Sequence, residues 1–386
     1  MNRHALTAGL VFDGDAICRD TAVVIDGGRI EKVVHVATVD APLRDLGPGM
    51  LVPGFVDVQV NGGGGVLLNE TPTLEGARAI AAAHRRFGTT GLLPTVITDA
   101  PKVMEAAAAA VAEAIRQDVA GVLGIHIEGP FIDLARKGAH DARFIRKPAD
   151  KDIDWLCNLK CGRVLVTLAP NVVAPEQIAR LVRAGVIVSL GHAEASAEET
   201  FAAIDAGAQG FTHLFNAMSQ MTGRAPGMAG AALAHPNVFC GIIADGEHVH
   251  PTALLAAIAA KRRGKLFFVS DAMPSAAGGP PAFSLQGRPV HVNDGRLLLA
   301  DGTLAGSNIT LSGAVDYGRQ VLGLKTEHAL NMASLNPAAF LGLDKQLGRL
   351  APGYRANMAL LSNGGTNRPF DASATWIDGQ ITERSS

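Results

Sequence analysis

Carboxylate and imidazole side chains lie at the ends of three apolar runs that the sequence predicts to be buried strands. Glu128 follows the run 122–127, His192 follows 186–190, and His213 lies within 210–214. One carboxylate and two imidazoles form a ligand set of the kind that catalytic zinc uses, with a coordination position left for water. Such a metal lowers the pKa of its bound water and polarises a carbonyl group. Together the three residues predict a hydrolytic metal centre, although each one alone also fits a buried, hydrogen-bonded polar group.

A fourth polar residue, Asp271, comes two residues after the apolar run 266–269. Its carboxylate could take a proton from an attacking water and return it to a leaving amine. We therefore predict that Asp271 is the catalytic acid and base of the same centre.

Alternating strands and helices must position these residues. The runs that predict strands are 55–60, 91–96, 122–127, 164–168, 186–190, 210–214, 240–244 and 266–269, and those that predict the helices between them are 74–87, 100–118, 175–184, 197–206 and 252–261. Strands separated by helices pair in parallel with right-handed crossovers. The stretch 53–345 is long enough for a closed (β/α)8 barrel, which needs about 250 residues and has its active site at the carboxyl ends of the strands. We predict an α/β fold with such a metal-dependent TIM-like barrel; a doubly wound open sheet is the competing arrangement.

The two ends of the chain read differently from its middle. β-branched runs on either side of Gly27 and Gly28 predict a hairpin over 22–33, and residues 347–381 again have the pattern of strands and turns. We expect 1–52 and 346–386 to meet as one small β domain beside the barrel. A further hairpin pattern predicts a β-hairpin insertion near 281–302.

The composition argues against several classes of protein. With 48% hydrophobic and 18% charged residues, the chain is too apolar to be disordered. A net charge of −2, without a dense Lys/Arg stripe, argues against a nucleic-acid partner. No run approaches the about 20 apolar residues of a membrane helix, and the first 15 residues lack the pattern of a signal peptide. The four cysteines form no CxxC pair, so we expect reduced thiols in a cytoplasmic protein.

Nine short motifs follow one another between about residue 50 and residue 307. They are Pro53-Gly-Phe-Val-Asp57, His126-Ile-Glu-Gly-Pro130, Lys137-Gly-Ala-His140, Gly191-His192, Thr212-His-Leu-Phe-Asn-Ala-Met218, Gly223-Arg-Ala-Pro-Gly227, Ala244-Asp-Gly-Glu-His248, Asp271-Ala272 and Gly302-Thr-Leu-Ala-Gly306. In this order they resemble the amidohydrolase superfamily and, within it, the family of N-acetylglucosamine-6-phosphate deacetylases. The resemblance implies a barrel with a small β-sandwich domain and a homodimer. It also implies hydrolysis of N-acetyl-D-glucosamine 6-phosphate to glucosamine 6-phosphate and acetate, in amino-sugar catabolism.

The resemblance also assigns roles to single residues. It implies that Glu128, His192 and His213 bind the metal and that Asp271 is the acid and base. The residues that it places against the substrate are Ala139, His140, Asn216, Ala217, Arg224, His248 and Leu304. Of these, His140 would contact the sugar or the acetamide carbonyl, and Leu304 would border the acetyl group.

Arg224 and His248 are the residues that the resemblance places at the phosphate, across the dimer interface. The forked donors of an arginine suit a phosphate group, and a histidine adds a second donor. Arg224 lies between Gly223 and Pro226, which predicts a loop that presents its side chain.

One departure from the superfamily bears on the number of metals. Many amidohydrolases carry His-x-His at the end of the first strand and hold two metals, whereas this chain has Gln59 and Asn61 there. Amides are poor zinc ligands compared with imidazole. We therefore predict one divalent metal per subunit, with Gln59 as a hydrogen-bonding group of the substrate site. Zn2+ is our first choice, and Fe2+, Co2+ and Mn2+ are also compatible with the ligand set.

Three other functions stay open on the sequence alone. A deacetylase of N-acetylgalactosamine 6-phosphate differs only at the sugar C4 hydroxyl, which no residue pattern resolves. A barrel glycosidase could use Glu128 and Asp271 as paired carboxylates, but it would leave His192 and His213 without a role. A non-catalytic sugar-phosphate-binding protein could keep the barrel and lose the chemistry.

Overall fold

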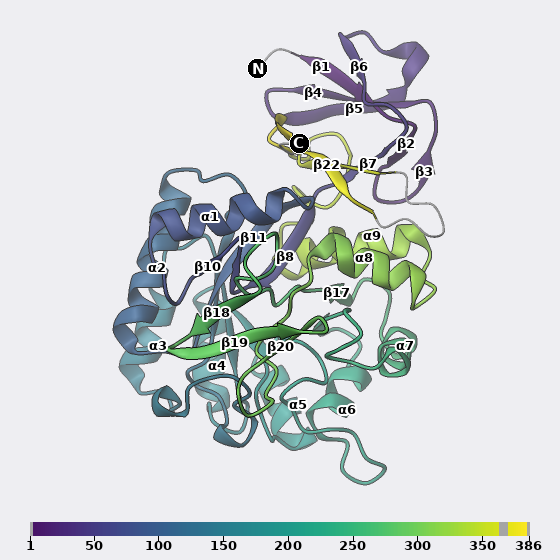
Figure 1. Ribbon diagram of the computed structural model, residues 1–386. Coiled ribbons are helices and arrows are strands. Elements are labelled where there is room, and N and C mark those ends of the chain that lie inside the picture. Colours follow the sequence, from purple (N-terminus) through teal and green to yellow (C-terminus); the bar gives the residue numbers. More distant parts are fainter. Residues whose placement is uncertain (1–2, 363–369, 384–386) are drawn as a thin grey trace.

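A sheet of parallel strands curls round on itself in the middle of the molecule (Figure 1). The computed structural model describes residues 3–362 and 370–383, and within them this sheet has eight strands. In sheet order they are β8 (Phe55–Val60), β11 (Thr89–Ile97), β12 (Gly124–Glu128), β13 (Arg163–Leu168), β14 (Ile187–Leu190), β15 (Gly210–Phe211), β16 (Phe239–Ile242) and β17 (Leu266–Phe268). Beyond β17, Ala272 pairs in parallel with Val60 of β8, which brings the last strand round to the first. The fold is therefore the predicted barrel and not an open sheet.

Helices cover the outside of the barrel (Figure 1). Over the described residues they are α1 (Leu74–Arg85), α2 (Pro101–Arg116), α3 (Asp150–Cys157), α4 (Pro175–Arg183), α5 (Ala197–Asp205), α6 (Gly227–Ala234), α7 (Pro251–Ala260), α8 (Leu311–Gln320), α9 (Thr326–Ala333) and α10 (Leu335–Phe340), with short 3-10 turns η1 (Val36–Thr38), η2 (Leu134–Arg136) and η3 (Ala142–Phe144). Local sequence explains their ends: Ser196 and Glu199, for example, form a capping box that starts α5. None of the described helices is long and apolar enough to cross a membrane.

Burial on both faces explains why the barrel strands read as continuous apolar runs. Every residue of β8 is buried, including Asp57 and Gln59, because the helices cover one face and the barrel interior the other. Between the barrel strands, two helices escaped the sequence analysis for different reasons. Helix α3 has only eight residues and begins with charged ones, so its apolar stripe is short. Helix α6 is apolar on all sides and therefore lacks the one-sided pattern of an amphipathic helix.

Strands from both ends of the chain form a small β sandwich beside the barrel (Figure 1). One sheet contains β1 (His4–Thr7), β4 (Thr21–Asp26), β5 (Arg29–His35) and β6 (Leu43–Asp45). The other contains β2 (Leu10–Phe12), β3 (Ile17–Cys18), β7 (Met50–Pro53), β21 (Met358–Leu361), β22 (Ala372–Ile377) and β23 (Gln380–Glu383). Side chains from both segments, such as Leu6, Met358 and Trp376, share one apolar core. Part of the expected C-terminal segment, 363–369 and 384–386, lies outside the described residues.

The insertion after the eighth strand is a small antiparallel sheet that lies across the barrel (Figure 1). It consists of β18 (Ala282–Leu285), β19 (Arg288–Asn293) and β20 (Arg296–Leu298). The sequence analysis expected one hairpin here, but Gln286 and Gly287 make a second turn, both with positive φ. A short ribbon of β9 (Gly62–Gly63) and β10 (Val66–Leu67) follows β8. Leu285 of the insertion and Leu67 of the ribbon belong to one apolar cluster, which fixes the sheet to the barrel.

Candidate active site

The four polar residues singled out from the sequence meet at the carboxyl ends of the barrel strands. Glu128 is the last residue of β12, His192 and His213 follow β14 and β15 by two residues, and Asp271 follows β17 by three. All four line one cavity of about 360 Å3. The barrel therefore brings together side chains that lie up to 143 residues apart in the chain (271 − 128 = 143).

The backbone at three of these residues is unfavourable for any residue other than glycine. His192, His213 and Asp271 have φ values of 49°, 33° and 50°. A left-handed conformation costs an ordinary L-residue about 1–2 kcal/mol, and such residues cluster at functional sites. Each of the three side chains therefore lies at the cavity although its backbone conformation is unfavourable.

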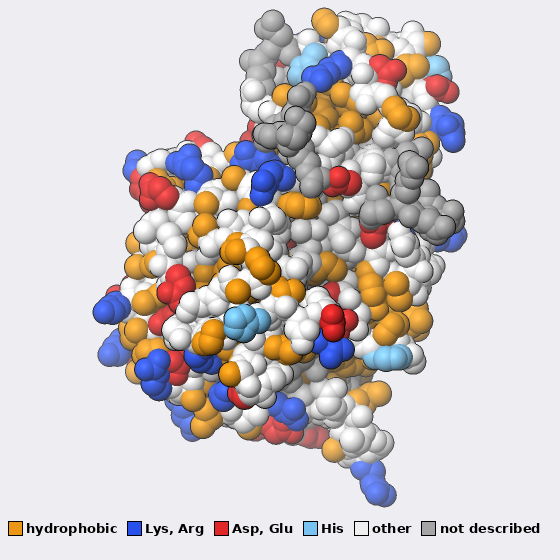
Figure 2. Space-filling model, viewed as in Figure 1, with side chains coloured by type: hydrophobic (Ala, Val, Ile, Leu, Met, Phe, Trp, Pro, Cys, Tyr) orange, Lys and Arg blue, Asp and Glu red, His pale blue; other side chains and the backbone are white. Residues whose placement is uncertain are grey.

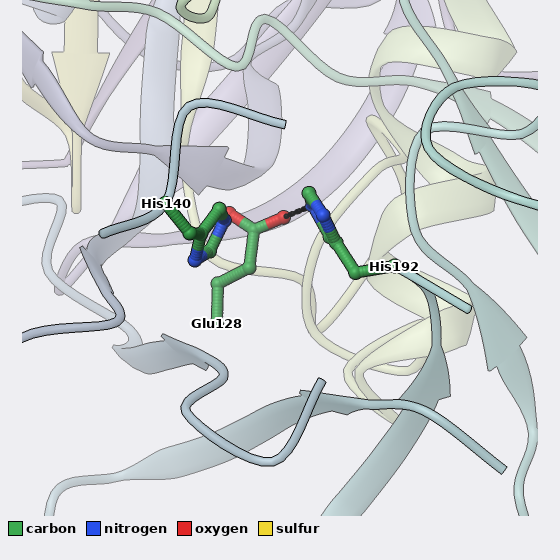
Figure 3. A group of neighbouring side chains, drawn as sticks. All are labelled: Glu128, His140 and His192. Atoms are coloured by element: carbon green, nitrogen blue, oxygen red, sulfur yellow. Dashed lines mark hydrogen bonds and ion pairs between the residues drawn. The ribbon is translucent and has the colours of Figure 1, made fainter. Parts of the chain in front are cut away.

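Glu128, His192 and His213 bring three ligand atoms to nearly one point. The Glu128 Oε1 atom lies 3.2 Å from His192 Nε2 and 3.1 Å from His213 Nε2, and the two nitrogens are 3.0 Å apart. Ligands about 2.0–2.1 Å from a tetrahedral zinc are about 3.3–3.4 Å from one another, so the three atoms are close to the spacing that a metal would need. His140 is an alternative ligand, since its ring, the Glu128 carboxylate and the His192 ring offer ligand atoms within 4.8 Å of one another (Figure 3).

Hydrogen bonds and charge prepare this group for a cation. His192 Nδ1 lies 2.9 Å from the Arg136 carbonyl oxygen and donates to it, which leaves the Nε2 lone pair for a metal. Burial raises the pKa of the Glu128 carboxyl, but its hydrogen bonds to His192 and His213 outweigh this and hold that pKa well below its usual range. Burial lowers the pKa of His213, yet contact with the Glu128 carboxylate raises it overall. The donor set consists of one buried, negatively charged carboxylate and two imidazoles. It therefore fits a divalent metal.

Asp271 is connected to the ligand group through the Gln59 amide, and a second amide, Asn61, also holds it. Gln59 Nε2 lies 3.2 Å from Asp271 Oδ1 and also 3.2 Å from both oxygens of Glu128. Asn61 Nδ2 donates to the same Asp271 Oδ1 at 2.6 Å. Burial, with a smaller contribution from the Glu128 charge, raises the pKa of Asp271 to about 6. A carboxyl group with a pKa near neutrality suits a residue that must both accept and return a proton.

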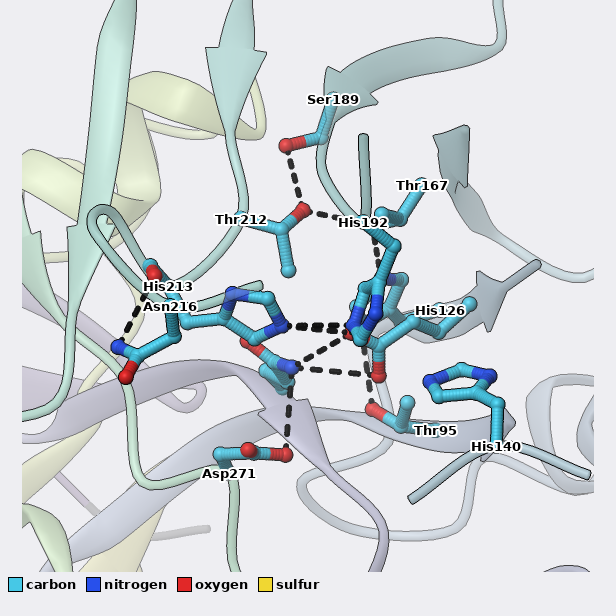
Figure 4. Close-up of polar contacts among 12 residues, drawn as sticks. Thr95, His126, His140, Thr167, Ser189, His192, Thr212, His213, Asn216 and Asp271 are labelled. Atoms are coloured by element: carbon cyan, nitrogen blue, oxygen red, sulfur yellow. Dashed lines mark hydrogen bonds and ion pairs between the residues drawn. The ribbon is translucent and has the colours of Figure 1, made fainter. Parts of the chain in front are cut away.

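A layer of polar side chains in the barrel interior contacts the strand ends that carry the ligands (Figure 4). His126 bonds through Nε2 to the Thr167 hydroxyl at 2.8 Å, and that hydroxyl bonds to Thr212 Oγ1 at 2.6 Å. Burial lowers the pKa of His126 to about 4, so its ring is neutral and acts as a hydrogen-bonding spacer. Thr212 precedes His213 and His126 lies two residues before Glu128, so the layer ties two strand ends together below the candidate metal ligands.

Six of the eight residues predicted to contact substrate line the same cavity. They are Ala139, His140, Asn216, Ala217, His248 and Leu304. His140 is held by a 2.7 Å hydrogen bond between its Nδ1 and Thr98 Oγ1, and burial keeps its pKa well below the usual range. The other two are elsewhere: Gln59 is 1% exposed beneath the carboxylates, and Arg224 is exposed on the loop 221–226, outside the cavity wall.

Two residues of the site were not identified from the sequence. Asn61 was considered only as a poor metal ligand, although its position two residues after Gln59 on the strand could have suggested a shared face. Arg136 lines the cavity and pairs with Glu194, and nothing in its local sequence pointed there. His250, whose role the sequence left open, caps α7 by accepting from the Thr252 backbone at 3.2 Å. On the face shown in Figure 2, cationic and anionic side chains are interspersed.

Comparisons with known proteins extend this description. Residues 50–382 match the amidohydrolase family, and residues 4–46 match the NagA composite domain. The N-acetylgalactosamine-6-phosphate deacetylase of Shewanella sp. (strain ANA-3) is 46% identical over 347 residues, which cover 89% of this chain and 86% of that protein. The crystal structure of N-acetylglucosamine-6-phosphate deacetylase from Pasteurella multocida is 32% identical, with a TM-score of 0.95 over 99% of this chain and 100% of its own. A mutant of the Mycobacterium smegmatis deacetylase in complex with N-acetyl-D-glucosamine-6-phosphate has a TM-score of 0.91 at 31% identity and covers 99% of both chains.

Proposed function

Because the chain belongs to the amidohydrolase family, we propose that it hydrolyses N-acetyl-D-glucosamine 6-phosphate to glucosamine 6-phosphate and acetate in amino-sugar catabolism. The observation that carries this proposal is a buried carboxylate, Asp271, in the same cavity as a carboxylate and two imidazoles whose ligand atoms lie 3.0–3.2 Å apart. A barrel glycosidase would need neither imidazole.

We propose that one divalent metal, Zn2+ in the first instance, is held by Glu128, His192 and His213. When bound, it would polarise the acetyl carbonyl and lower the pKa of a water molecule at the site. The chain supplies the remaining steps. Asp271 takes one proton from the attacking water and delivers it to the amide nitrogen as the carbon–nitrogen bond breaks. The products are the free amine and acetic acid, which loses its proton to the solvent and becomes acetate. Gln59 and Asn61 hold Asp271 in place through Oδ1.

The substrate then lies along the cavity with its acetyl group between His140 and Leu304. His140 is neutral and held by Thr98, so its other ring nitrogen serves as a hydrogen-bond partner of the acetamide or the sugar. Asn216 and Ala217 border the sugar, and His248 receives the phosphate. Arg224, exposed on its loop, completes the phosphate site in the cavity of a second copy of the chain. We propose a homodimer on this ground, and cytoplasmic action on the ground of the four free cysteines in the described residues.

A single assay tests the activity. Acetate release is measured over N-acetylglucosamine, N-acetylgalactosamine and their 6-phosphates, with and without prior chelator dialysis. We expect metal-dependent release from a 6-phosphate and much slower release from the free sugars. Activity that survives metal removal would favour a glycosidase, and tight binding without release of acetate would favour a binding protein.

The same assay separates the two epimers. The 46% identity to an N-acetylgalactosamine-6-phosphate deacetylase makes the galacto epimer the second candidate substrate. A higher kcat/KM for N-acetylgalactosamine 6-phosphate would reassign the substrate and leave the chemistry unchanged.

A further inference from the structure

A buried carboxylate contacts the histidine at the phosphate end of the cavity. Asp245 and His248 lie in the turn between β16 and α7, and Asp245 Oδ2 is 2.7 Å from His248 Nδ1. The other oxygen, Oδ1, accepts from the backbone nitrogens of Glu247 at 2.9 Å and His248 at 3.0 Å. The side chains are 12% and 7% exposed. Both oxygens of Asp245 are therefore used, one to shape the turn and one to hold the ring.

This contact fixes which ring nitrogen is available to a ligand. A carboxylate oxygen can only accept, so His248 Nδ1 must carry a proton. Among the described residues, its Nε2 makes no hydrogen bond, and His248 lines the same cavity as Asp271. A phosphate oxygen placed against Nε2 would accept a hydrogen bond, so a ring held between Asp245 and a phosphate would carry a proton on both nitrogens.

The neighbouring charged groups do not compete for this role. Glu247 is paired with Arg296 of β20, and Tyr317 of α8 is the other titratable group packed near the turn. Asp271 adds a second negative charge on the cavity side. Burial raises the pKa of Asp245, but the bond to His248 outweighs it and holds that pKa below its usual range. Asp245 is thus a carboxylate with an imidazole as its side-chain partner.

We propose that Asp245 is a positioning residue for phosphate recognition, which holds His248 as a cationic Nε2–H donor to the 6-phosphate of the substrate. The inference rests on the proposed function, because it takes the substrate to be a sugar phosphate. Charged hydrogen bonds are about twice as strong as neutral ones, so an anion of high charge gains most from a protonated ring. The phosphate would therefore be bound by His248 in the state that Asp245 holds, and not by His248 alone.

The Asp245→Asn variant tests this directly. Its amide oxygen can still accept from the turn backbone, but its NH2 group faces Nδ1, reversing the ring tautomer and removing the charge. We expect KM for N-acetylglucosamine 6-phosphate to rise about tenfold, with kcat within about twofold of wild type. kcat/KM for unphosphorylated N-acetylglucosamine should not change. Glu247→Gln is the matched control and should leave KM unaltered, because the Glu247 side chain pairs with Arg296.

A double-mutant cycle with His248→Gln separates positioning from simple turn formation. If Asp245 acts through His248, Asp245→Asn should raise KM little further in the His248→Gln background. Additive effects, or an equal loss on the unphosphorylated sugar, would overturn the proposal. So would an unchanged KM in Asp245→Asn when the wild type is active, whereas a wild type without deacetylase activity would count against the proposed function instead.

A measurement on the wild type covers the case in which Asp245→Asn fails to fold. The 15N–1H correlations of the His248 ring, assigned by comparison with His248→Gln, report its protonation. With glucosamine 6-phosphate at saturation, we expect both ring nitrogens to be protonated. A neutral ring in that complex would overturn the proposal.

Discussion

The two ends of the cavity are built in contrasting ways. At the metal corner, Glu128, His192 and His213 are between 2% and 5% exposed, and hydrogen bonds within the chain connect each to the next. At the phosphate end, His248 is held by Asp245, but the arginine expected there, Arg224, is exposed on a loop that does not reach the cavity of its own chain. On the roles proposed above, one chain holds every residue assigned to bond breaking, whereas one of the two residues assigned to the phosphate lies outside its cavity.

If the proposed roles hold, bond breaking requires only the fold of one chain, and phosphate recognition also requires a second copy. A buried cluster of three titratable groups is costly to form, so the barrel must hold it rigidly, and its function follows directly from the fold. A phosphate can be recognised by a few donors added from outside, because a charged donor remains effective at a partly exposed site. The predictions below alter one end at a time.

The largest effect is expected at the metal corner from Asp271→Asn. The amide cannot accept the proton of the attacking water, so turnover should fall by about 10²–10⁴-fold, the range of general acid–base catalysis. Metal content, measured by atomic emission, should not change. Asp205→Asn, at the exposed end of α5, is the control. Near-normal turnover in Asp271→Asn would show that this carboxylate is not the base.

Two histidine variants should separate metal binding from substrate contact. His213→Ala should lose most of its bound metal and its activity. His140→Ala should retain metal and lose activity, because we assign His140 to the substrate although its ring atoms also lie near Glu128. The measurement is the metal to protein ratio after gel filtration. A His140→Ala protein that lacks metal would make His140 the ligand.

The free-energy cost of burying the Asp57 carboxyl group should appear in the pH dependence of stability. Burial raises the pKa of Asp57 to about 7, and its Oδ2 has no hydrogen-bond partner in the described residues. The folded state thus keeps a proton that the unfolded chain loses near pH 4, so this group makes stability fall as pH rises from about 4 to about 7. Asp57→Asn should remove up to about 4 kcal/mol of that decline. Urea unfolding of both proteins at pH 5, 6, 7 and 8 measures it, and parallel curves would contradict the assignment.

At the phosphate end, Arg224→Ala should raise KM for the phosphorylated substrate about tenfold, the value of one charged hydrogen bond, with little change in kcat. The exposed Arg262→Ala is the control. Mixed dimers of Arg224→Ala and Asp271→Asn subunits should then show the wild-type KM, since one of their two cavities would have both Arg224 and Asp271 intact. No recovery of that KM would mean that Arg224 does not act across the interface.

The smallest effect is expected at the border of the phosphate end. His250→Ala removes the cap of α7, and we expect a loss of about 1 kcal/mol in the free energy of unfolding with unchanged kinetics. A change in KM would instead give His250 a part in substrate binding.

The sequence predicted the barrel well because buried parallel strands leave a strong signal. The run 55–60 coincides with β8, and the five expected helices agree with α1, α2, α4, α5 and α7 to within two residues at each end. Strand β15 is shorter than expected, because the chain leaves the sheet after Phe211 and His213 lines the cavity. Helix α3, with a short apolar stripe, and helix α6, which is apolar on all sides, were not recognised.

The site was predicted less completely, for a physical reason. Residue types and strand ends identify which side chains can do chemistry, but not which of them touch. The contact between Asn61 and Asp271 spans 210 residues, and the role of Asp245 depends on a turn geometry that its sequence alone does not specify. The third metal ligand, His213 or His140, likewise depends on distances.

The left-handed backbone at His192, His213 and Asp271 has a consequence for how such a chain can evolve. Glycine would relieve about 1–2 kcal/mol of strain at each position while removing the reactive group. Selection for stability and selection for turnover therefore oppose each other at these three sites. Among descendants of this barrel, glycine at positions 192, 213 and 271 would be the mark of a lineage in which selection for hydrolysis had been relaxed.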